Sequence, residues 1–209
     1  MEKLQFITDG MDADETTRQA LAAIEGGCRW VQIRMKDADD AEVLDAAMHI
    51  IPFARKHGAT VVLDDRVHLV AESGADGVHI GKEDMPPAEA RRILGTDKII
   101  GVTVNSLEDI LSVDRRLIDY MGMGPFRFTT TKKKLAATLG IDGYRRILSE
   151  ARNRGIDTRV VAIGGITLGD VPELMTTGIN GIAVSGAISR AENSTEATRD
   201  FMKSLNTTK

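Results

Sequence analysis

The 209-residue sequence predicts an α/β fold, a single-domain (β/α)8 TIM barrel spanning residues 1–209. Eight short apolar runs alternate with amphipathic segments of helical period, as in a parallel sheet covered by helices. The runs are continuously apolar, as strands buried on both faces are. About 200 residues is the compact end of the size range of such barrels.

The predicted strands recur along the whole chain. In order they are LQFI (4–7), WVQIR (30–34), TVVLD (60–64), GVHI (77–80), IIGVT (99–103), DYMGM (119–123), VVAI (160–163) and GIAV (181–184). Between the first strands lie two predicted helices, DETTRQALAAIEGG (14–27) and DDAEVLDAAMHIIPFARKHGA (39–59). The second ends in Lys-His-Gly, a sequence typical of a helix C-terminus. An open doubly wound sheet is the alternative fold, but no Gly-x-Gly-x-x-Gly follows the first strand.

Composition and charge exclude several classes of function. The formal net charge is -4 and the sequence pI is about 5.6, which argues against a nucleic-acid or membrane-surface partner. The single cysteine, Cys28, excludes a disulfide framework and a cysteine-based zinc site. The first residues, MEKLQFITDG, lack the apolar core of a secretory signal, and no run reaches the ~18 apolar residues of a membrane span. We therefore expect a cytoplasmic protein.

In a TIM barrel the functional residues lie where the strands end, and two glycine-rich turns occur there. AIGGITLGD and AVSGAIS each place small residues between a strand and a helix, which leaves backbone N–H groups open to an anion. The loops after strands 7 and 8 form the recurrent phosphate site of such barrels. The pair predicts a phosphorylated ligand, with close packing at a tight turn as the alternative for either turn alone.

Two aspartates follow adjacent predicted strands. Asp65 and Asp84 would converge there, because neighbouring strands lie only ~5 Å apart. Mg²⁺ takes one or two protein carboxylates and completes its coordination with water and substrate phosphate. The alternative is a helix cap, particularly for Asp84, which precedes Met85-Pro86. A nearby phosphate site favours Mg²⁺ as the cofactor.

A long polar segment follows the sixth strand. In DYMGMGPFRFTTTKKK (119–134) three threonines precede three lysines, and the next helix is expected only at Ile141. Loops of that length in compact domains are usually functional. Threonine hydroxyls and a lysine ammonium bind phosphoryl oxygens and neutralise a departing anion. Lys132, closest to the threonines, is the functional candidate, while Lys133 and Lys134 fit a solvated charge run.

Basic residues also end the second strand. Gln32, Arg34 and Lys36 alternate with a period of two, so we expect all three to point the same way, into the same cleft. His79 fits a hydrogen-bonded barrel residue better than a ligand, and His57 is expected near a helix end. No Ser/His/Asp arrangement and no metal-spaced histidine pair occurs in the sequence.

These residues, in this order, resemble the thiamine-phosphate synthase (thiamine-phosphate pyrophosphorylase) family over about residues 30–190. The motifs are QIRMK, LDDR, GVHIGKED, GVTVNS, DYMGMGPFRFTTTK, VVAIGGI and GIAVSGAIS. The resemblance implies the joining of hydroxymethylpyrimidine diphosphate to hydroxyethylthiazole phosphate with release of pyrophosphate. It also implies a dissociative mechanism, in which diphosphate leaves first and the thiazole nitrogen captures the pyrimidine cation. The absence of a recognisable nucleophile agrees with that mechanism.

The resemblance also implies roles for individual residues. The contacts to the pyrimidine diphosphate would be Gln32, Arg34, Lys36, Asp64, Thr103 and Lys132. The contacts to the thiazole phosphate would be Thr129, Thr131, Gly165, Val184 and Ser185. Asp65 and Asp84 would bind Mg²⁺. Lys132, Arg34 and Lys36 would be catalytic, because they stabilise the departing pyrophosphate.

The sequence departs from the family at several positions. Arg34-Met35-Lys36 replaces the usual Arg-Glu-Lys, Asp64 replaces an asparagine, and Thr103 and Asn105 replace a serine and a histidine. A thiazole tautomerase of a related branch is one alternative function, but it would not need the two aspartates or Lys132. A non-catalytic binding protein of the thiamine pathway is another, and Asp65 or Lys132 would then be lost. The partners are expected to be small phosphorylated molecules, and a homo-oligomer is left open.

Overall fold

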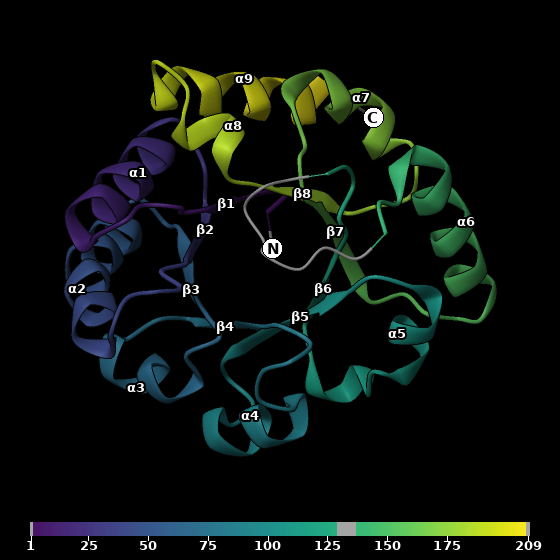
Figure 1. The fold of residues 1–209 in the computed structure, drawn as a ribbon, viewed down its shortest axis with the longest axis horizontal. Coiled ribbons are helices and arrows are strands. Elements are labelled where there is room, and N and C mark those ends of the chain that lie inside the picture. Colours follow the sequence, from purple (N-terminus) through teal and green to yellow (C-terminus); the bar gives the residue numbers. More distant parts are fainter. Residues whose placement is uncertain (1, 129–136, 208–209) are drawn as a thin grey trace.

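The computed structural model describes residues 2–128 and 137–207. Its strands pair in parallel and in chain order, and β8 pairs with β1, so that they close into a barrel (Figure 1). The strands are β1 (Leu4–Ile7), β2 (Trp30–Ile33), β3 (Thr60–Asp64), β4 (Gly77–Ile80), β5 (Ile99–Val104), β6 (Tyr120–Met123), β7 (Arg159–Ile163) and β8 (Gly181–Val184). The predicted (β/α)8 barrel is confirmed.

Helices surround the barrel and cover the outside of the sheet (Figure 1). They are α1 (Ala13–Glu25), α2 (Asp40–Lys56), α3 (Val70–Ser73), α4 (Pro87–Leu94), α5 (Leu107–Ser112), α6 (Gly140–Asn153), α7 (Val171–Met175), α8 (Gly186–Ser189) and α9 (Ser194–Thr207). The 3₁₀ segments are η1 (Val67–Leu69), η2 (Arg115–Leu117) and η3 (Leu168–Asp170). Across residues 2–128 and 137–207, the structure contains no helix with both the length and the apolar character of a membrane span.

The two predicted helices begin and end for identifiable reasons. The side chains of Asp12 and Asp39 accept hydrogen bonds from backbone N–H groups in the first turns of α1 and α2. His57 ends α2, as expected, and Gly58 follows with a φ of 67°, a conformation that glycine adopts without steric cost. Local sequence chemistry therefore defines these boundaries.

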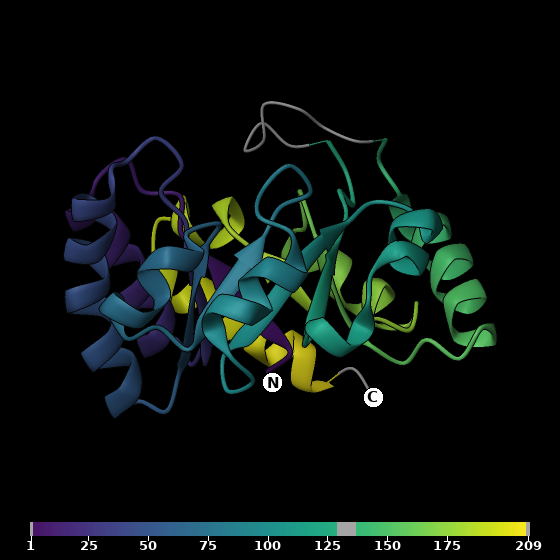
Figure 2. The same cartoon turned by 90° about the horizontal axis from the view of Figure 1, so that it is seen from below.

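The barrel interior is packed rather than hollow. A small buried cluster lies within it, comprising Ile7, Trp30, Tyr120, Val161 and Ala183. The rings of Trp30 and Tyr120 meet edge to face with their centroids 4.7 Å apart. Figure 2 shows the start of β1 and the end of α9 below the barrel, and the loops after β2 and β4 above it. Because the interior is packed, ligands are expected at the rim formed by the C-terminal ends of the strands.

Candidate active site

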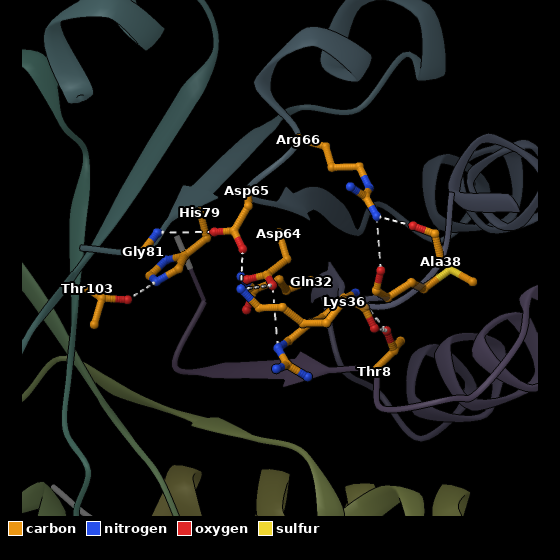
Figure 3. Close-up of polar contacts among 12 residues, drawn as sticks. Thr8, Gln32, Lys36, Ala38, Asp64, Asp65, Arg66, His79, Gly81 and Thr103 are labelled. Atoms are coloured by element: carbon orange, nitrogen blue, oxygen red, sulfur yellow. Dashed lines mark hydrogen bonds and ion pairs between the residues drawn. The ribbon is translucent and has the colours of Figure 1, made fainter. Parts of the chain in front are cut away.

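The polar residues at the ends of β2 and β3 converge on Asp64 (Figure 3). Gln32 Nε2 donates to Asp64 Oδ1 at 3.0 Å. On the other carboxylate oxygen, Arg34 Nε lies 3.4 Å from Asp64 Oδ2 and Lys36 Nζ lies 3.8 Å from it. All three residues of the period-two pattern thus reach one carboxylate. An amide donor and two cations therefore surround the Asp64 carboxylate.

The next residue, Asp65, is fixed by its backbone as well as its side chain. Its φ is 61°, and no other non-glycine residue in the described part of the chain has a positive φ. Its N–H donates to the His79 carbonyl at 2.8 Å, which anchors the turn to β4. Oδ1 accepts from the Gly81 N–H at 3.1 Å, and Oδ2 accepts from Lys36 Nζ. Asp65 therefore lies between a cation and the loop that carries Asp84.

Asp65 and Asp84 form an interacting pair of carboxyl groups. A Cβ built on Gly81 would lie 2.3 Å from Asp84 Oδ2 and 3.6 Å from Asp65 Oδ1, so both carboxyls border this glycine. Burial and the hydrogen bond with Asp65 raise the pKa of Asp84. Burial alone would raise the pKa of Asp65, but its hydrogen bonds with Asp84 and Lys36 outweigh burial and lower it. A bound cation would offset the repulsion between the two carboxyl groups.

The cap interpretation of Asp84 is wrong. The N-cap of α4 is Pro86, and no side-chain hydrogen bond caps that helix. No group of three or more potential metal-binding side chains gathers anywhere in residues 2–128 and 137–207. Two carboxylates with room for water and phosphate oxygens are the set that suits Mg²⁺. The residues present therefore fit the expected cofactor.

A hydrogen-bonded chain runs up the barrel interior to Thr103. Gln5 Nε2 donates to the Tyr120 hydroxyl at 3.2 Å, and that hydroxyl lies 3.0 Å from His79 Nδ1. If Tyr120 donates to Nδ1, the neutral ring carries its proton on Nε2 and donates to Thr103 Oγ1, 3.0 Å away. The prediction that His79 is a hydrogen-bonded barrel residue is confirmed. With that tautomer, the hydroxyl hydrogen of Thr103 points away from His79.

The two glycine-rich turns follow β7 and β8, which are neighbours in the barrel. Gly164 and Gly165 have φ values of 98° and 70°. Val184 is buried at the end of β8, and the Oγ atom of Ser185 is buried without a hydrogen-bond partner in the described part of the chain. Gly165, Val184 and Ser185 thus lie on adjacent strand ends.

Similarity to known proteins shows the family to which the chain belongs. A family model described as thiamine monophosphate synthase matches residues 4–188. The chain belongs to this family. It is 48% identical to the thiamine-phosphate synthase of Bacteroides thetaiotaomicron, over 97% of both chains, and 50% identical to that of Phocaeicola vulgatus, over 96% of both. A solved thiamine phosphate pyrophosphorylase from Pyrococcus furiosus is 33% identical, with a TM-score of 0.85 and coverage of 98% of this chain and 95% of that one.

The resemblance drawn from the sequence motifs is therefore confirmed, and membership of this synthase family places the chain among the enzymes of thiamine biosynthesis. Three residues expected in its site, Thr129, Thr131 and Lys132, lie outside the described residues, as do Lys133 and Lys134.

Two residues that the sequence does not indicate as functional lie together beside the glycine turn after β7. Arg127 follows β6 and forms a paired ion bridge with Asp170 of η3, at 2.7 and 2.8 Å. The only signal in the sequence was an arginine just ahead of the threonines. A partner 43 positions away cannot be read from that signal.

Proposed function

We propose that this protein is a thiamine-phosphate synthase that couples the pyrimidine diphosphate with the thiazole phosphate and releases pyrophosphate. One observation carries the proposal: Gln32, Arg34 and Lys36 surround Asp64 beside the Asp65–Asp84 pair. This cationic and acidic set lies at the strand ends, in a chain about half identical to thiamine-phosphate synthases.

The first substrate would bind through its diphosphate. Arg34 and Lys36 supply two positive charges, and Lys132 is proposed as a third. Asp65 and Asp84 would hold Mg²⁺, which when bound supplies charge that neutralises phosphate oxygens. Desolvation would lower the pKa of Lys36, but its hydrogen bond to Asp65 and the charges of Asp64, Asp65 and Asp84 outweigh it and raise the pKa. Lys36 is therefore a cation at neutral pH.

The reaction would proceed by departure of the diphosphate and not by attack of a protein group. Besides the carboxyl groups, the described part of the site contains hydrogen-bond donors and cations, and its one histidine, His79, is engaged with Tyr120 and Thr103. Such groups stabilise a leaving anion and hold two reactants in line. The hydroxyl of Thr103, directed by His79, would donate a hydrogen bond to the pyrimidine substrate, as the family resemblance implies.

The second substrate would place its phosphate at the turns after β7 and β8. Gly165, Val184 and Ser185 would supply backbone and hydroxyl groups, and Thr129 and Thr131 would complete the site. The buried Ser185 Oγ lacks a partner in the described structure, which supports a role toward a ligand. The partners would thus be small phosphorylated molecules in the cytoplasm, with neither nucleic acid nor membrane involved.

The experiment supplies both substrates with Mg²⁺ and follows thiamine phosphate and pyrophosphate together. Equal amounts of the two products are expected, and none when either substrate is omitted. Isomerisation of a thiazole without coupling would instead identify the tautomerase. Binding of either ligand without turnover would identify a binding protein. Light scattering of the same sample addresses the homo-oligomer.

A further inference from the structure

The turn after β7 is held by the segment that follows β6. Three successive carbonyl groups of the turn accept hydrogen bonds from that segment. The Phe126 N–H donates to the Ile163 carbonyl at 2.8 Å and the Arg127 N–H donates to the Gly164 carbonyl at 3.0 Å. The Arg127 side chain completes the set, because its Nη1 donates to the Gly165 carbonyl at 3.1 Å. Arg127 thus makes two of the three bonds.

These bonds also orient the amides of the turn. In a planar trans peptide the C=O of one residue and the N–H of the next point in opposite directions. The N–H groups of Gly164, Gly165 and Ile166 therefore point away from the β6 segment. Since β7 lies between β6 and β8, they point toward the side on which β8 and Ser185 lie. Successive backbone N–H groups that face the same side attract anions.

The guanidinium of Arg127 is itself held in place. Nη1 and Nη2 donate to the two carboxylate oxygens of Asp170 at 2.8 and 2.7 Å. Asp170 also accepts from the N–H and hydroxyl of Thr167, both at 2.7 Å. Burial alone would raise the pKa of Asp170, but the bonds from Arg127 and Thr167 outweigh it and lower the pKa, so the carboxylate stays charged. The Phe126 ring lies 4.8 Å from the guanidinium carbon.

Close packing ties the stem of Arg127 to the glycine turn. A Cβ on Gly165 would lie 2.5 Å from Arg127 Cγ, so the side chain passes directly over this residue. A planar guanidinium can bond two carboxylate oxygens and a carbonyl from one position, whereas a lysine ammonium is a point charge without that fixed fork. The contacts therefore require arginine in particular.

We propose that Arg127 is a positioning residue for the phosphate of the thiazole substrate. Its contacts with the Asp170 carboxylate and with the carbonyl groups of Gly164 and Gly165 fix the turn after β7, so that the amides of the turn face that phosphate. This inference rests on the proposed function for the identity of the ligand. The geometry assigns no contact between Arg127 and either substrate, so its effect is transmitted through the turn.

The test compares Arg127→Met, Arg127→Lys and Asp170→Asn with the wild-type enzyme in the presence of Mg²⁺. Arg127→Met retains the packing stem and removes every donor of the guanidinium. We expect KM for the thiazole phosphate to rise about tenfold, the scale of one charged hydrogen bond, while KM for the pyrimidine diphosphate stays within about twofold. The KM for the thiazole phosphate of Arg127→Lys and of Asp170→Asn should lie between the values of the wild type and Arg127→Met. Arg116→Met, which removes the ion pair between Arg116 of η2 and Asp114, is the matched control and should change neither KM.

If the ion pair only stabilised the fold, Arg127→Met would lower Tm and leave both KM values unchanged. That result would overturn the inference. Equal increases in both KM values would overturn it as well. Calorimetric titration of each protein with thiazole phosphate alone separates the inference from the proposed function. A wild type that binds this ligand without coupling would refute the proposed function only, and weaker binding by Arg127→Met would still support the positioning role. A wild type that does neither would overturn both.

Discussion

Replacing Asp64 by asparagine tests how the unusual carboxylate of this site affects substrate binding. In the structure Asp64 forms ion pairs with Arg34 and Lys36, the two cations expected to hold the diphosphate. Asparagine keeps an oxygen that can accept from Gln32 and loses the charge. It is also the residue that the family resemblance implies at this position. We expect Asp64→Asn to bind the pyrimidine diphosphate more tightly and to retain or increase turnover at neutral pH.

The magnitude follows from the two ion-pair distances, 3.4 Å to Arg34 and 3.8 Å to Lys36. At an effective dielectric constant of about 20, unit charges at these separations attract each other by about 4–5 kcal/mol. Desolvation of the partly buried charges offsets most of this energy. A net competition on the order of 1–2 kcal/mol remains, the scale of a hydrogen bond to a charged group. KM for the diphosphate should therefore fall about 5- to 30-fold.

The assay is the initial rate of pyrophosphate release at varied pyrimidine diphosphate, with the thiazole phosphate saturating, at several pH values. Asp65→Asn is the matched control, because it makes the same chemical change one residue along the chain and should lose most of the activity. An inactive Asp64→Asn beside an active Asp65→Asn would show that the two roles are reversed. A KM that rises in Asp64→Asn would refute the competition between Asp64 and the substrate.

The remaining predictions concern the third cation and the metal pair. Lys132→Ala should reduce turnover by roughly 10²-fold, the scale of one charged transition-state contact, while Lys133→Ala should change it little; equal, mild effects would indicate a solvated charge run. A chelator should abolish coupling without changing the far-UV circular dichroism, and full activity after chelation would count against both Asp65 and Asp84 as metal ligands. Gly81→Ala should raise the Mg²⁺ concentration for half-maximal rate severalfold with little change in Tm, because the new Cβ would displace the flexible end of Asp84; an unchanged Mg²⁺ dependence would contradict that arrangement.

The fold was predictable because its signals are local. Continuous apolar runs gave each strand to within about a residue, as β3 illustrates, predicted as 60–64 and observed as Thr60–Asp64. The helix expected at Ile141 begins at Gly140. The strand order also followed, since a closed parallel barrel of alternating strands and helices pairs consecutive strands. The short 3₁₀ segments were not predicted, because one turn of helix carries no periodic pattern.

The site was predictable in composition but only partly in contacts. The period of two indicated that Gln32, Arg34 and Lys36 share one side. It could not reveal that all three side chains contact Asp64, because these contacts depend on the register between β2 and β3. The contact of Arg127 with the turn after β7 depends in the same way on the tertiary fold. The spacing of motifs in the sequence indicates neither the contacts of Asp64 nor that of Arg127.

The left-handed backbone of Asp65 decides which mutant libraries can be interpreted at this position. Asparagine and glycine accept a φ of 61° readily, whereas other L-residues lose about 1–2 kcal/mol there and β-branched residues lose more. A saturation screen at residue 65 that selects for growth would therefore mix effects of lost stability with effects of the lost carboxylate. Asparagine alone removes the charge while preserving both the backbone and the size of the side chain, so it is the substitution from which the chemistry of this residue can be read.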